Sequence, residues 1–314
     1  MKIIDIIGKA KRFVLRIERR IVHTWLTMLA PKHYYVSTEE YHLKHPSKVK
    51  KISITIDNLI FATSKGEGNN SMEIKRSNYI VCKATCFAYS DIIQLEDGCC
   101  IYSIKENNGW IGTVDFMDEI LLKDTDSWCK LRKCHMTKHI DKAIKIGGMF
   151  GFNYYHFIFQ ILPKLFETSE IDSSIPLLLD RAATDVPSMR QLTEWCNMQQ
   201  RGLICMDYDV AYQVDELYVI SDSNICVPNW KKDADYERIP VALYSPTVID
   251  IVSKYLLAHK DRSKFPKKIF ISRKSTKRRA YNEPDLWQVA KQYGFIKVQP
   301  ENLDISQQIA FIVQ

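Results

Sequence analysis

Hydrophobic and polar positions change their pattern once along the chain, near residue 148. Before this point, short β-branched and aromatic runs are separated by clusters of Gly, Asn, Asp and Lys, which is typical of strands joined by turns. We expect strands at residues 52–56, 78–82, 92–95, 100–104, 110–114 and 119–122. None of these runs carries a catalytic signature, so the pattern predicts a peripheral β-rich portion.

Beyond residue 148, short continuous apolar runs alternate with helical patterns. Such alternation predicts parallel sheets covered by helices on both faces. We expect helices at residues 153–166, 187–199, 245–259 and 306–311, and strands at residues 175–179, 203–206, 217–220 and 268–272. Ser245 and Pro246 suit the N-cap and the first position of the third helix. Ligands of parallel sheets gather at the carboxyl ends of the strands, so candidate chemistry is sought there.

The first 30 residues place apolar and basic positions on opposite faces of a helix. The apolar positions are Ile3, Ile6, Ile7, Ala10, Phe13, Val14, Ile17 and Ile21. Charges interrupt the segment too often for a membrane-spanning helix or a secretory signal. The pattern predicts either a basic amphipathic helix that lies on an anionic membrane surface or a helix packed on its own domain. The first alternative places a cytoplasmic protein at the inner face of the plasma membrane.

Charge is concentrated in two segments of a chain whose net charge is +7. Residues 1–50 hold eleven Lys and Arg against four Asp and Glu, and residues 262–279 hold nine cations and no acid. The remainder is acidic, which indicates localised anionic partners rather than general stickiness. With 314 residues and 46% hydrophobic content, the chain is globular and longer than most single domains. We expect a basic segment at 1–46, a β-rich and then α/β domain at 47–243, and a smaller α/β domain at 244–314.

The nine cysteines are odd in number and scattered without short paired spacings, so we interpret them as reduced thiols of a cytosolic protein. The nearest approach to a metal pattern is formed by Cys129, Cys134, His135 and His139, whose two histidines could share a helix face. Their spacing is irregular, and the paired knuckles of a zinc site are missing. Ordinary thiols are the favoured interpretation, and no metal site is predicted.

A glycine-bearing loop leads into the helix expected at 153–166, where three polar residues form a sparse stripe: Asn153, His156 and Gln160. The rest of this helix is apolar, so the stripe must find partners or line a cleft. His156 falls in the first turn, where the helix dipole favours a neutral imidazole that can accept a proton. It is either such a base or a core histidine held by a backbone carbonyl. Pro163 is expected to kink or end the helix.

The densest basic run follows the strand expected at 268–272 and precedes a helix that begins at Asn282. Its cations are Arg273, Lys274, Lys277, Arg278 and Arg279. A helix over 284–293 and a strand at 295–298 would complete a βαβ unit, with Asp285 in a capping-box-like position. Guanidinium groups at a strand end, facing the free N–H groups of a helix N-terminus, form a phosphate site. The alternative is a solvated loop.

Taken in order, these motifs resemble glycosyltransferase family 61, especially its bacterial members associated with capsular polysaccharide synthesis. The resemblance rests on GGxFxxNYYHxxxxxLPKL from Gly147, KKIFISRxxxxRRxxNE from Lys267, the Gly-Phe strand that follows, and PENLDISQQI from Pro300. It covers Gly147–Gln314. Neither main motif is specific alone, but the ordered set is.

The resemblance implies a GT-B architecture of two Rossmann-like domains facing across a cleft. It also implies transfer of a hexosyl or pentosyl group from a nucleotide sugar to a glycan or lipid-linked acceptor, with inversion and without an obligatory metal or other cofactor. Cationic side chains would then neutralise the leaving nucleoside diphosphate in place of Mg²⁺. On this reading Arg273 and Arg278 bind the diphosphate, Arg279 or Lys277 assists, and Glu283 accepts hydrogen bonds from the ribose.

Asn153 and His156 match the motif of the family, and inversion requires a base that takes the proton of the acceptor. Four positions after this histidine the family often has an acidic residue, where this chain has Gln160. Three alternatives follow: His156 is the base, a carboxylate elsewhere is the base, or activity is compromised.

Family members continue past the helix expected at 306–311 into a strand and a His-Gly-Ala loop that helps bind the donor, whereas this sequence ends at Gln314. The predicted fold is therefore a GT-B-like α/β chain with an incomplete second Rossmann-like domain, an added β-rich N-terminal portion and a basic amphipathic N-terminal helix. The alternative function is a non-catalytic or inactive truncated remnant that binds nucleotide or glycan. A nucleic-acid binder is disfavoured, because few aromatic residues interleave with the basic run.

Overall fold

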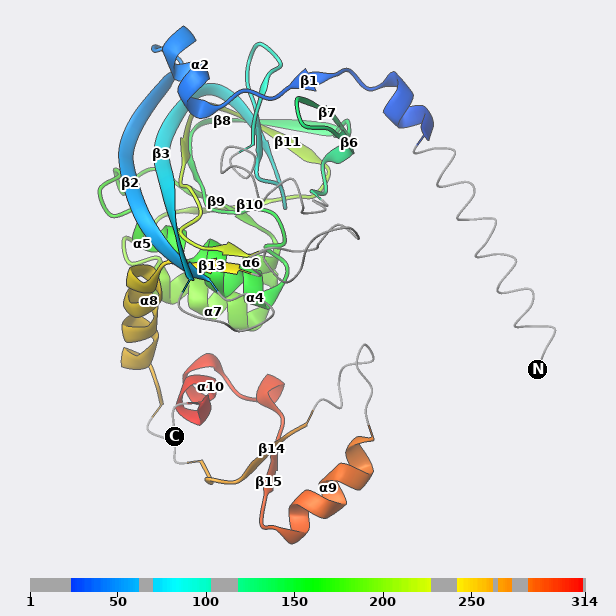
Figure 1. The fold of residues 1–314 in the computed structure, drawn as a ribbon, viewed down its shortest axis with the longest axis vertical. Coiled ribbons are helices and arrows are strands. Elements are labelled where there is room, and N and C mark those ends of the chain that lie inside the picture. The colour runs from blue at the N-terminus through cyan, green and yellow to red at the C-terminus, as the bar shows by residue number, and fades with distance from the viewer. Residues whose placement is uncertain are drawn as a thin grey trace, which may run out of the picture. The chain divides into compact units, whose positions relative to one another are not determined.

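The computed structural model divides the chain into two compact units, Met1–Ser245 and Pro246–Gln314 (Figure 1). It describes residues 24–61, 70–102, 118–226, 242–261, 265–272 and 282–312. The basic helix predicted for the N-terminus lies largely outside these residues, with helix seen at 24–29. The strand expected at 110–114 lies outside them entirely. Within the described part of the chain, no helix is long and apolar enough to cross a membrane.

The first unit is built on one mixed sheet, which has ten strands among the described residues. Its parallel part consists, in hydrogen-bonding order, of β10 (Leu203–Met206), β9 (Leu177–Asp180), β8 (Met136–Lys145) and β11 (Val210–Val219). From β11 the sheet continues in antiparallel pairs through β3 (Asn70–Phe87), β2 (Val49–Phe61), β13 (Ala242–Tyr244) and β12 (Ile225–Cys226). The α/β class agrees with the prediction, but the sheet is mixed rather than parallel throughout.

The β-rich N-terminal portion is not peripheral to this sheet, in contrast to the prediction. β3 pairs with β11 from Ala211↔Phe87 to Val219↔Tyr79, so the long hairpin β2–β3 extends the sheet that carries the parallel strands. Side chains from the hairpin and from the parallel strands share one hydrophobic core. Local periodicity could not show this, because the pairing joins segments that are far apart in the sequence.

Strand β8 occupies the centre of the parallel part, and the sequence pattern did not predict it. Its first seven residues are exposed or half-buried, and the last three are buried, so no regular alternation marks it as a strand. His139 therefore lies on a strand and does not share a helix face with His135. Cys129 is buried on β7 (Trp128–Leu131).

The first unit also contains short strands, some of which join the large sheet at β3 while others form a separate sheet. β4 (Ile92–Gln94) pairs with β3 and with β5 (Cys100–Tyr102). A separate three-stranded sheet consists of β1 (His33–Tyr34), β7 and β6 (Leu121–Asp124). A second hydrophobic cluster, which includes Tyr102, joins these strands. The turn before β4 contains Tyr89 and Asp91.

Apart from residues 24–29 and α2 (Thr38–Lys44), which precede β2, the described helices of the first unit follow the loop after β8 (Figure 1). α4 (Tyr154–His156), η2 (Phe157–Ile161) and α5 (Leu162–Phe166) form one continuous helical segment, in which η2 is a π-helix. α6 (Ala182–Asp185) and α7 (Pro187–Cys196) follow β9. α7 packs on α5 and α6, as expected for the helical layer of an α/β unit.

The second unit contains the predicted βαβ arrangement. β14 (Ile269–Ile271) and β15 (Ile296–Val298) pair in parallel, and α9 (Glu283–Gln292) lies between them in sequence. Gly294 follows the helix with a φ of +76°, in the left-handed region that glycine adopts without steric cost. The sequence prediction is confirmed for this supersecondary unit because each of its signals is local.

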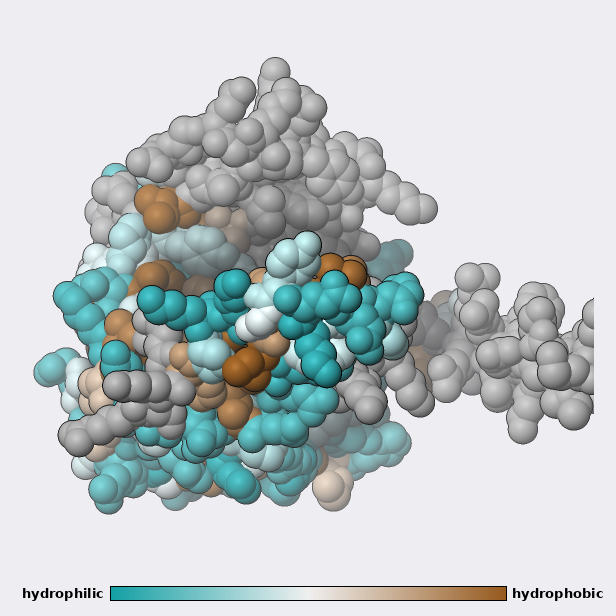
Figure 2. Space-filling model, turned by 90° about the horizontal axis from the view of Figure 1, so that it is seen from below, coloured by the Kyte–Doolittle hydropathy of each residue, from teal (hydrophilic) through white to brown (hydrophobic). Residues whose placement is uncertain are grey.

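The rest of the second unit has a thin core. α8 (Pro246–Ala258), the 3₁₀ turn η4 (Pro300–Asn302) and α10 (Ile305–Ile312) complete its described part. α9 buries none of its residues. Large apolar side chains are exposed at Ile271, Leu286, Val289, Tyr293 and Ile296. On the face shown in Figure 2, hydrophobic residues are visible among mainly hydrophilic ones.

One detail of the predicted helix start is wrong. Asn282 precedes α9 but its side chain makes no capping hydrogen bond to the helix backbone. Instead its Nδ2 donates to Asp285 Oδ2 at 2.5 Å.

Candidate functional site

The helical segment that carries the predicted polar stripe begins where the sequence placed it. Asn153 is the N-cap, and its Oδ1 accepts a hydrogen bond from the Tyr155 N–H at 3.0 Å. The segment runs on through Pro163 to Phe166, so the proline does not end it.

A widened turn explains how the helix accommodates this proline. A proline has no N–H for the carbonyl four residues earlier, which here belongs to Phe159. This residue lies in the π-helix η2, and its carbonyl oxygen accepts from Asn224 Nδ2 at 2.6 Å. The side chain of Asn224 therefore replaces the backbone donor that Pro163 lacks. Single π turns of this kind are frequent at functional sites.

His156 is the first member of a chain of hydrogen-bonded side chains. It is only 6% exposed, and its Nδ1 lies 2.6 Å from Gln160 Oε1. Gln160 Nε2 donates to Asp222 Oδ2 at 3.0 Å, and Lys164 Nζ forms an ion pair with Asp222 Oδ1 at 2.6 Å. We refer to these four residues as the His156 chain. Three of them lie at successive i, i+4 positions of one helical segment.

The order of donors and acceptors in the His156 chain determines which imidazole nitrogen carries the proton. A carboxylate only accepts hydrogen bonds, so the amide NH₂ of Gln160 must face Asp222 and its carbonyl must face His156. Nδ1 therefore carries a proton and donates to Gln160. In the neutral ring, Nε2 then holds a lone pair, and none of the described residues donates a hydrogen bond to it. This arrangement gives His156 the tautomer that a general base needs.

The far end of the chain is a buried ion pair. Burial raises the pKa of Asp222, and the charge of Lys164 opposes this shift. Burial lowers the pKa of Lys164, but the charges of Asp222 and Asp91 outweigh burial, and the pKa is raised. Lys164 therefore stays cationic, and an Asp222 carboxylate anchors the amide of Gln160.

Two further carboxylates hold the glycine-bearing loop that precedes the helix. Asp180, at the end of β9, accepts from the Gly148 N–H at 2.9 Å and from the Tyr89 N–H at 2.7 Å. Asp91, just before β4, accepts from the Met149 N–H at 3.1 Å. These contacts fix the approach of the chain to His156.

The glycines of this loop are required by the closeness of the carboxylates. A Cβ atom at Gly147 or Gly151 would lie 2.8 or 2.5 Å from Asp180 Oδ2, and one at Gly148 would lie 2.4 Å from Asp91 Oδ1. No real Cβ contact is that short, so a side chain at any of these positions must displace the carboxylate or the loop.

Buried titratable groups surround this loop. Lys145 is buried, and its Nζ donates to the carbonyl oxygens of Ser90 and Gly147, each at 2.6 Å. Burial raises the pKa of Asp180 to about 6. Burial, followed by the charge of Asp91, raises the pKa of Asp118 to about 7. Shifts of this kind cluster at functional sites, although structural networks produce them too.

A small cavity joins the two groups of charged residues. Its volume is about 20 Å³, enough for a water-sized molecule. Its lining includes Asp91 and Lys145, which contact the glycine-bearing loop. It also includes Lys164 and Asp222 of the His156 chain. The cavity therefore lies between the residues that hold the loop and the charged end of the His156 chain.

The predicted donor-binding residues belong to the second unit, and one of them is described. Glu283, the first residue of α9, accepts from Ser272 Oγ at 2.6 Å and forms an ion pair with Lys297 at 2.5 Å, both through Oε1. Arg273, Lys277, Arg278 and Arg279 lie outside the described residues. Their role stays a prediction from the sequence.

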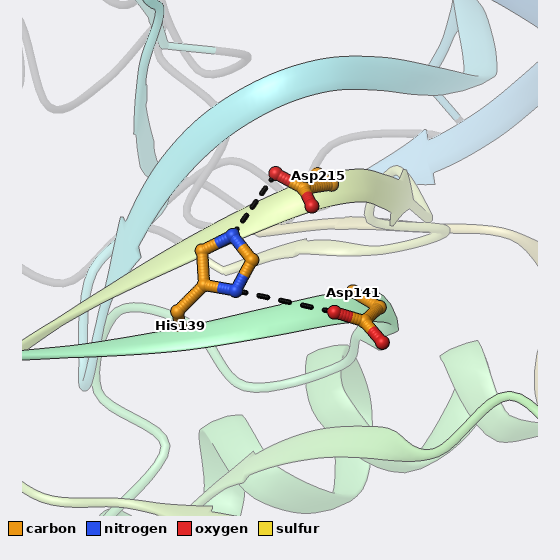
Figure 3. Close-up of side chains that lie close together, drawn as sticks. All are labelled: His139, Asp141 and Asp215. Carbon is orange, nitrogen blue, oxygen red and sulfur yellow. Dashed lines mark hydrogen bonds and ion pairs between the residues drawn. The ribbon is translucent and has the colours of Figure 1, made fainter.

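Three side chains, none of them a cysteine, lie close enough together to hold a metal ion. Among the described residues, the group that could hold a metal ion consists of His139, Asp141 and Asp215 (Figure 3). His139 Nε2 lies 3.0 Å from Asp215 Oδ1, and its Nδ1 lies 3.9 Å from Asp141 Oδ1. All three side chains are exposed, and the contacts fit ordinary surface pairs between β8 and β11.

Sequence reasoning missed the charged partners of His156. Lys164 could have been found, because it continues the spacing of His156 and Gln160 along the same helix face. Asp222 follows the end of β11, where the carboxyl-end rule directs attention, but its partner is 62 residues away in the sequence. Asp180 likewise ends β9.

Comparison with known proteins gives one match. The family model described as Glycosyltransferase 61 matches residues 154–313, which is just over half of the chain. The matched range includes most of the His156 chain's helix, Asp222 and all described elements of the second unit. No curated protein and no solved structure matches the chain.

Proposed function

This chain belongs to glycosyltransferase family 61, and from that premise we propose that it is an inverting, metal-independent glycosyltransferase. It moves a hexosyl or pentosyl group from a nucleotide sugar to a hydroxyl group of a glycan or lipid-linked acceptor. Family membership supports the glycosyltransferase activity, the nucleotide-sugar donor and the glycan acceptor. The observation that supports the mechanism most directly is the His156 chain.

In this mechanism His156 is the base. Its Nε2 takes the proton of the acceptor hydroxyl while the oxygen attacks the anomeric carbon and the nucleoside diphosphate leaves on the opposite side. The imidazolium that forms is stabilised at Nδ1 by Gln160 Oε1, which Asp222 polarises through the amide. Gln160 itself takes no proton, and it keeps the ring in the reactive tautomer.

Donor binding is assigned to the basic run between β14 and α9. Arg273 and Arg278 bind the diphosphate, and Arg279 or Lys277 assists. The parallel pairing of β14 and β15 supports this assignment, because the run then leaves the carboxyl end of a strand and enters a helix N-terminus. Glu283, positioned by Ser272 and Lys297, accepts hydrogen bonds from the ribose.

The finer setting is part of the same proposal. The two units would correspond to a GT-B arrangement, and the enzyme would act in capsular or surface polysaccharide synthesis. Its basic N-terminal segment would hold a cytoplasmic enzyme at the anionic inner face of the plasma membrane. The pattern of residues 1–30 and the motif resemblance support these assignments.

The proposal is tested first by donor binding. A panel of UDP-, GDP- and CMP-linked sugars should include at least one that raises the melting temperature of the protein, and Arg278→Ala should remove this rise. Absence of any rise with every donor of the panel would count against the proposal. A rise without nucleotide release in the presence of acceptors would indicate the non-catalytic binder instead.

Turnover then tests the base and the metal. We expect His156→Ala to lower the rate of sugar transfer by about 10²- to 10⁴-fold while the donor-dependent rise in melting temperature persists. His135→Ala, a change of an exposed histidine, is the matched control and should leave the rate unchanged. Loss of transfer on addition of EDTA, or in His139→Ala, would contradict metal independence.

A further inference from the structure

Four aromatic side chains gather where the loop enters the helix of His156: Phe150, Phe152, Tyr154 and Tyr155. Three of them are well exposed, Phe152 at 48%, Tyr154 at 38% and Tyr155 at 42%. Exposed aromatic groups that cluster in this way mark binding surfaces more often than chance exposure does.

The exposed rings connect directly to His156. Phe150 stacks on the imidazole with ring centroids 5.2 Å apart and an interplanar angle of 29°. Phe152 contacts Phe150 at 5.9 Å and meets Tyr89 edge-on at 5.7 Å. A ladder of rings therefore leads from the buried base to the exposed face of Phe152.

The backbone of Phe150 is held in a conformation that bulky residues avoid. Its φ is +61°, in the left-handed region, which costs on the order of 1–3 kcal/mol for a residue of this kind. The Asn153 N–H donates to the Phe150 carbonyl oxygen at 2.7 Å, and Gly151 N–H donates to Gly148 O at 3.1 Å, so a tight turn maintains it. Strain of this kind concentrates at ligand-binding positions.

The rings are packed against neighbouring aromatic side chains on one side, and the polar side chain of Asn153 lies next to them in the chain. Tyr155 Oη is hydrogen-bonded to Tyr244 Oη on β13, and Phe159 meets the Tyr244 ring at 5.4 Å. At the rim, Asn153 Nδ2 makes no hydrogen bond to the residues that the structure describes. The surface thus combines apolar ring faces with the exposed amide of Asn153, three residues before His156 in the chain.

We propose that Phe150 and Phe152 form the subsite on which a sugar ring of the acceptor stacks, with Asn153 as a hydrogen-bond donor to one of its hydroxyl groups. The proposal rests on the proposed function, and it identifies the acceptor as a ring presented by one apolar C–H face. A pyranose has such a face together with a rim of hydroxyl groups, which suits aromatic faces bordered by polar atoms. The stacked sugar would direct a hydroxyl group to His156 Nε2.

The position of the subsite in the chain agrees with this role. Phe152 precedes residues 154–313, which the family model matches, and it falls at a variable position of the GGxFxxNYYH motif, whereas His156 lies within both. Acceptor choice differs between enzymes that share a mechanism, so residues that select the acceptor are expected outside the shared part. A nucleobase could also stack on these rings, and the experiment distinguishes the two.

Saturation-transfer NMR of the full chain with methyl glycosides of common hexoses and pentoses tests the subsite without donor or turnover. We expect at least one glycoside to receive saturation at its ring C–H protons. Phe152→Ala and Phe152→Leu should weaken this binding about tenfold or more, whereas Phe152→Trp should retain it. The leucine variant keeps the apolar volume and lacks the ring face. Tyr34→Ala, which removes an exposed aromatic ring on β1, is the matched control and should bind like the wild type.

Equal binding in the wild type and Phe152→Ala would overturn the subsite, and so would no saturation of any glycoside. Saturation of UMP that competes with the glycoside and is lost in Phe152→Ala would assign the rings to the nucleobase and would also overturn it. The melting-temperature experiment with nucleotide sugars is independent, so its failure would contradict the enzyme assignment and leave the sugar site standing. Circular dichroism checks that each variant is folded.

Discussion

Gln160 shows how one side-chain amide can change the interpretation of a site. An amide cannot act as a base, and the sequence therefore left three alternatives for the origin of the base. The structure places its carbonyl on His156 Nδ1 and its NH₂ on Asp222. The residue is thus a positioning group, and the carboxylate that the sequence search lacked lies one hydrogen bond further away.

Replacing Gln160 tests this positioning role. Gln160→Leu removes the acceptor of the Nδ1 proton, so the reactive tautomer is no longer favoured and the transfer rate should fall on the order of 10- to 100-fold. The double change Gln160→Glu with Asp222→Asn moves the carboxylate onto Nδ1 without placing two like charges in contact, and this carboxylate stabilises the imidazolium. The acidic limb of the pH–rate profile should then move to higher pH, because the base must be neutral to act.

Gln213→Leu, at an exposed position of β11, is the control for these variants. An unchanged acidic limb in the double variant, together with a full rate in Gln160→Leu, would contradict the role of the amide.

Asp118 is predicted to make stability depend on pH. Its pKa is raised by burial and by the charge of Asp91 to about 7, whereas an unfolded chain has the ordinary value near 3.8. The folded state then binds more protons between pH 4 and 7, so the free energy of unfolding falls as pH rises through this window. The fall attributable to Asp118 is at most about 4 kcal/mol. Urea unfolding at pH 5 and pH 8 measures it.

Asp118→Asn cannot ionise and should reduce this dependence, leaving the part that comes from Asp180, whose pKa is raised to about 6. Asp126→Asn, at an exposed position, should leave the dependence as in the wild type. If the slope with pH were the same in both variants, Asp118 would not be its source.

At the scale of elements, local signals were predictable and non-local ones were not. β10 matches its expected residues, and α8 begins at Pro246 as its N-terminal signals indicate. β8 was missed, because its exposed first part and buried last part give no alternation. The π-helix was also missed, and the Asn224 side chain that donates to its Phe159 carbonyl lies far from Pro163 in the sequence.

The glycine-bearing loop is the element whose geometry is most restricted. Gly151→Ala would bring its Cβ within 2.5 Å of Asp180 Oδ2 and 3.1 Å of a backbone oxygen. We expect a loss of roughly 1–3 kcal/mol in the free energy of unfolding, as in other overpacked sites. The transfer rate should fall as well, because the same loop carries Phe150.

Gly202→Ala is the matched control for this loop. Its Cβ would lie 3.7 Å from Pro176 Cβ, an ordinary contact, so the change should be neutral or stabilising by up to about 1 kcal/mol. Chemical denaturation of both variants gives the comparison. Equal stability of the two variants would show that the loop can move away from Asp180.

For the whole molecule, the two units differ in how much they bury. The strands of the first unit share a large core, whereas α9 of the second unit buries no residue and β14 and β15 form a two-stranded sheet among the described residues. Such a sheet has little independent stability. Hydrogen exchange followed by mass spectrometry should therefore show amides of β14 and β15 exchanging at least tenfold faster than those of β8 and β11.

Addition of a nucleotide sugar should slow exchange in the second unit, because a ligand that binds the folded form stabilises it. Equal protection of the two units without ligand would contradict the difference in their cores.

At this scale the sequence predicted the part of the site that is continuous in the chain. The stripe of Asn153, His156 and Gln160 is a helical repeat, and the structure places its last two members in one hydrogen-bonded chain. Asp222 and Asp180 reach the site only because parallel strands end at the same edge of the sheet. Their contribution required the three-dimensional arrangement of β8, β9 and β11.

The His156 chain also has an evolutionary consequence. Where relatives carry an acidic residue at the position of Gln160, a second carboxylate at the position of Asp222 would place two like charges in contact, beside a single Lys164. We therefore expect these two positions to covary, with an acid at one of them and a neutral residue at the other. Selection would then preserve one negative charge in the hydrogen-bonded chain of the histidine. The sequence position that carries this charge could differ between relatives.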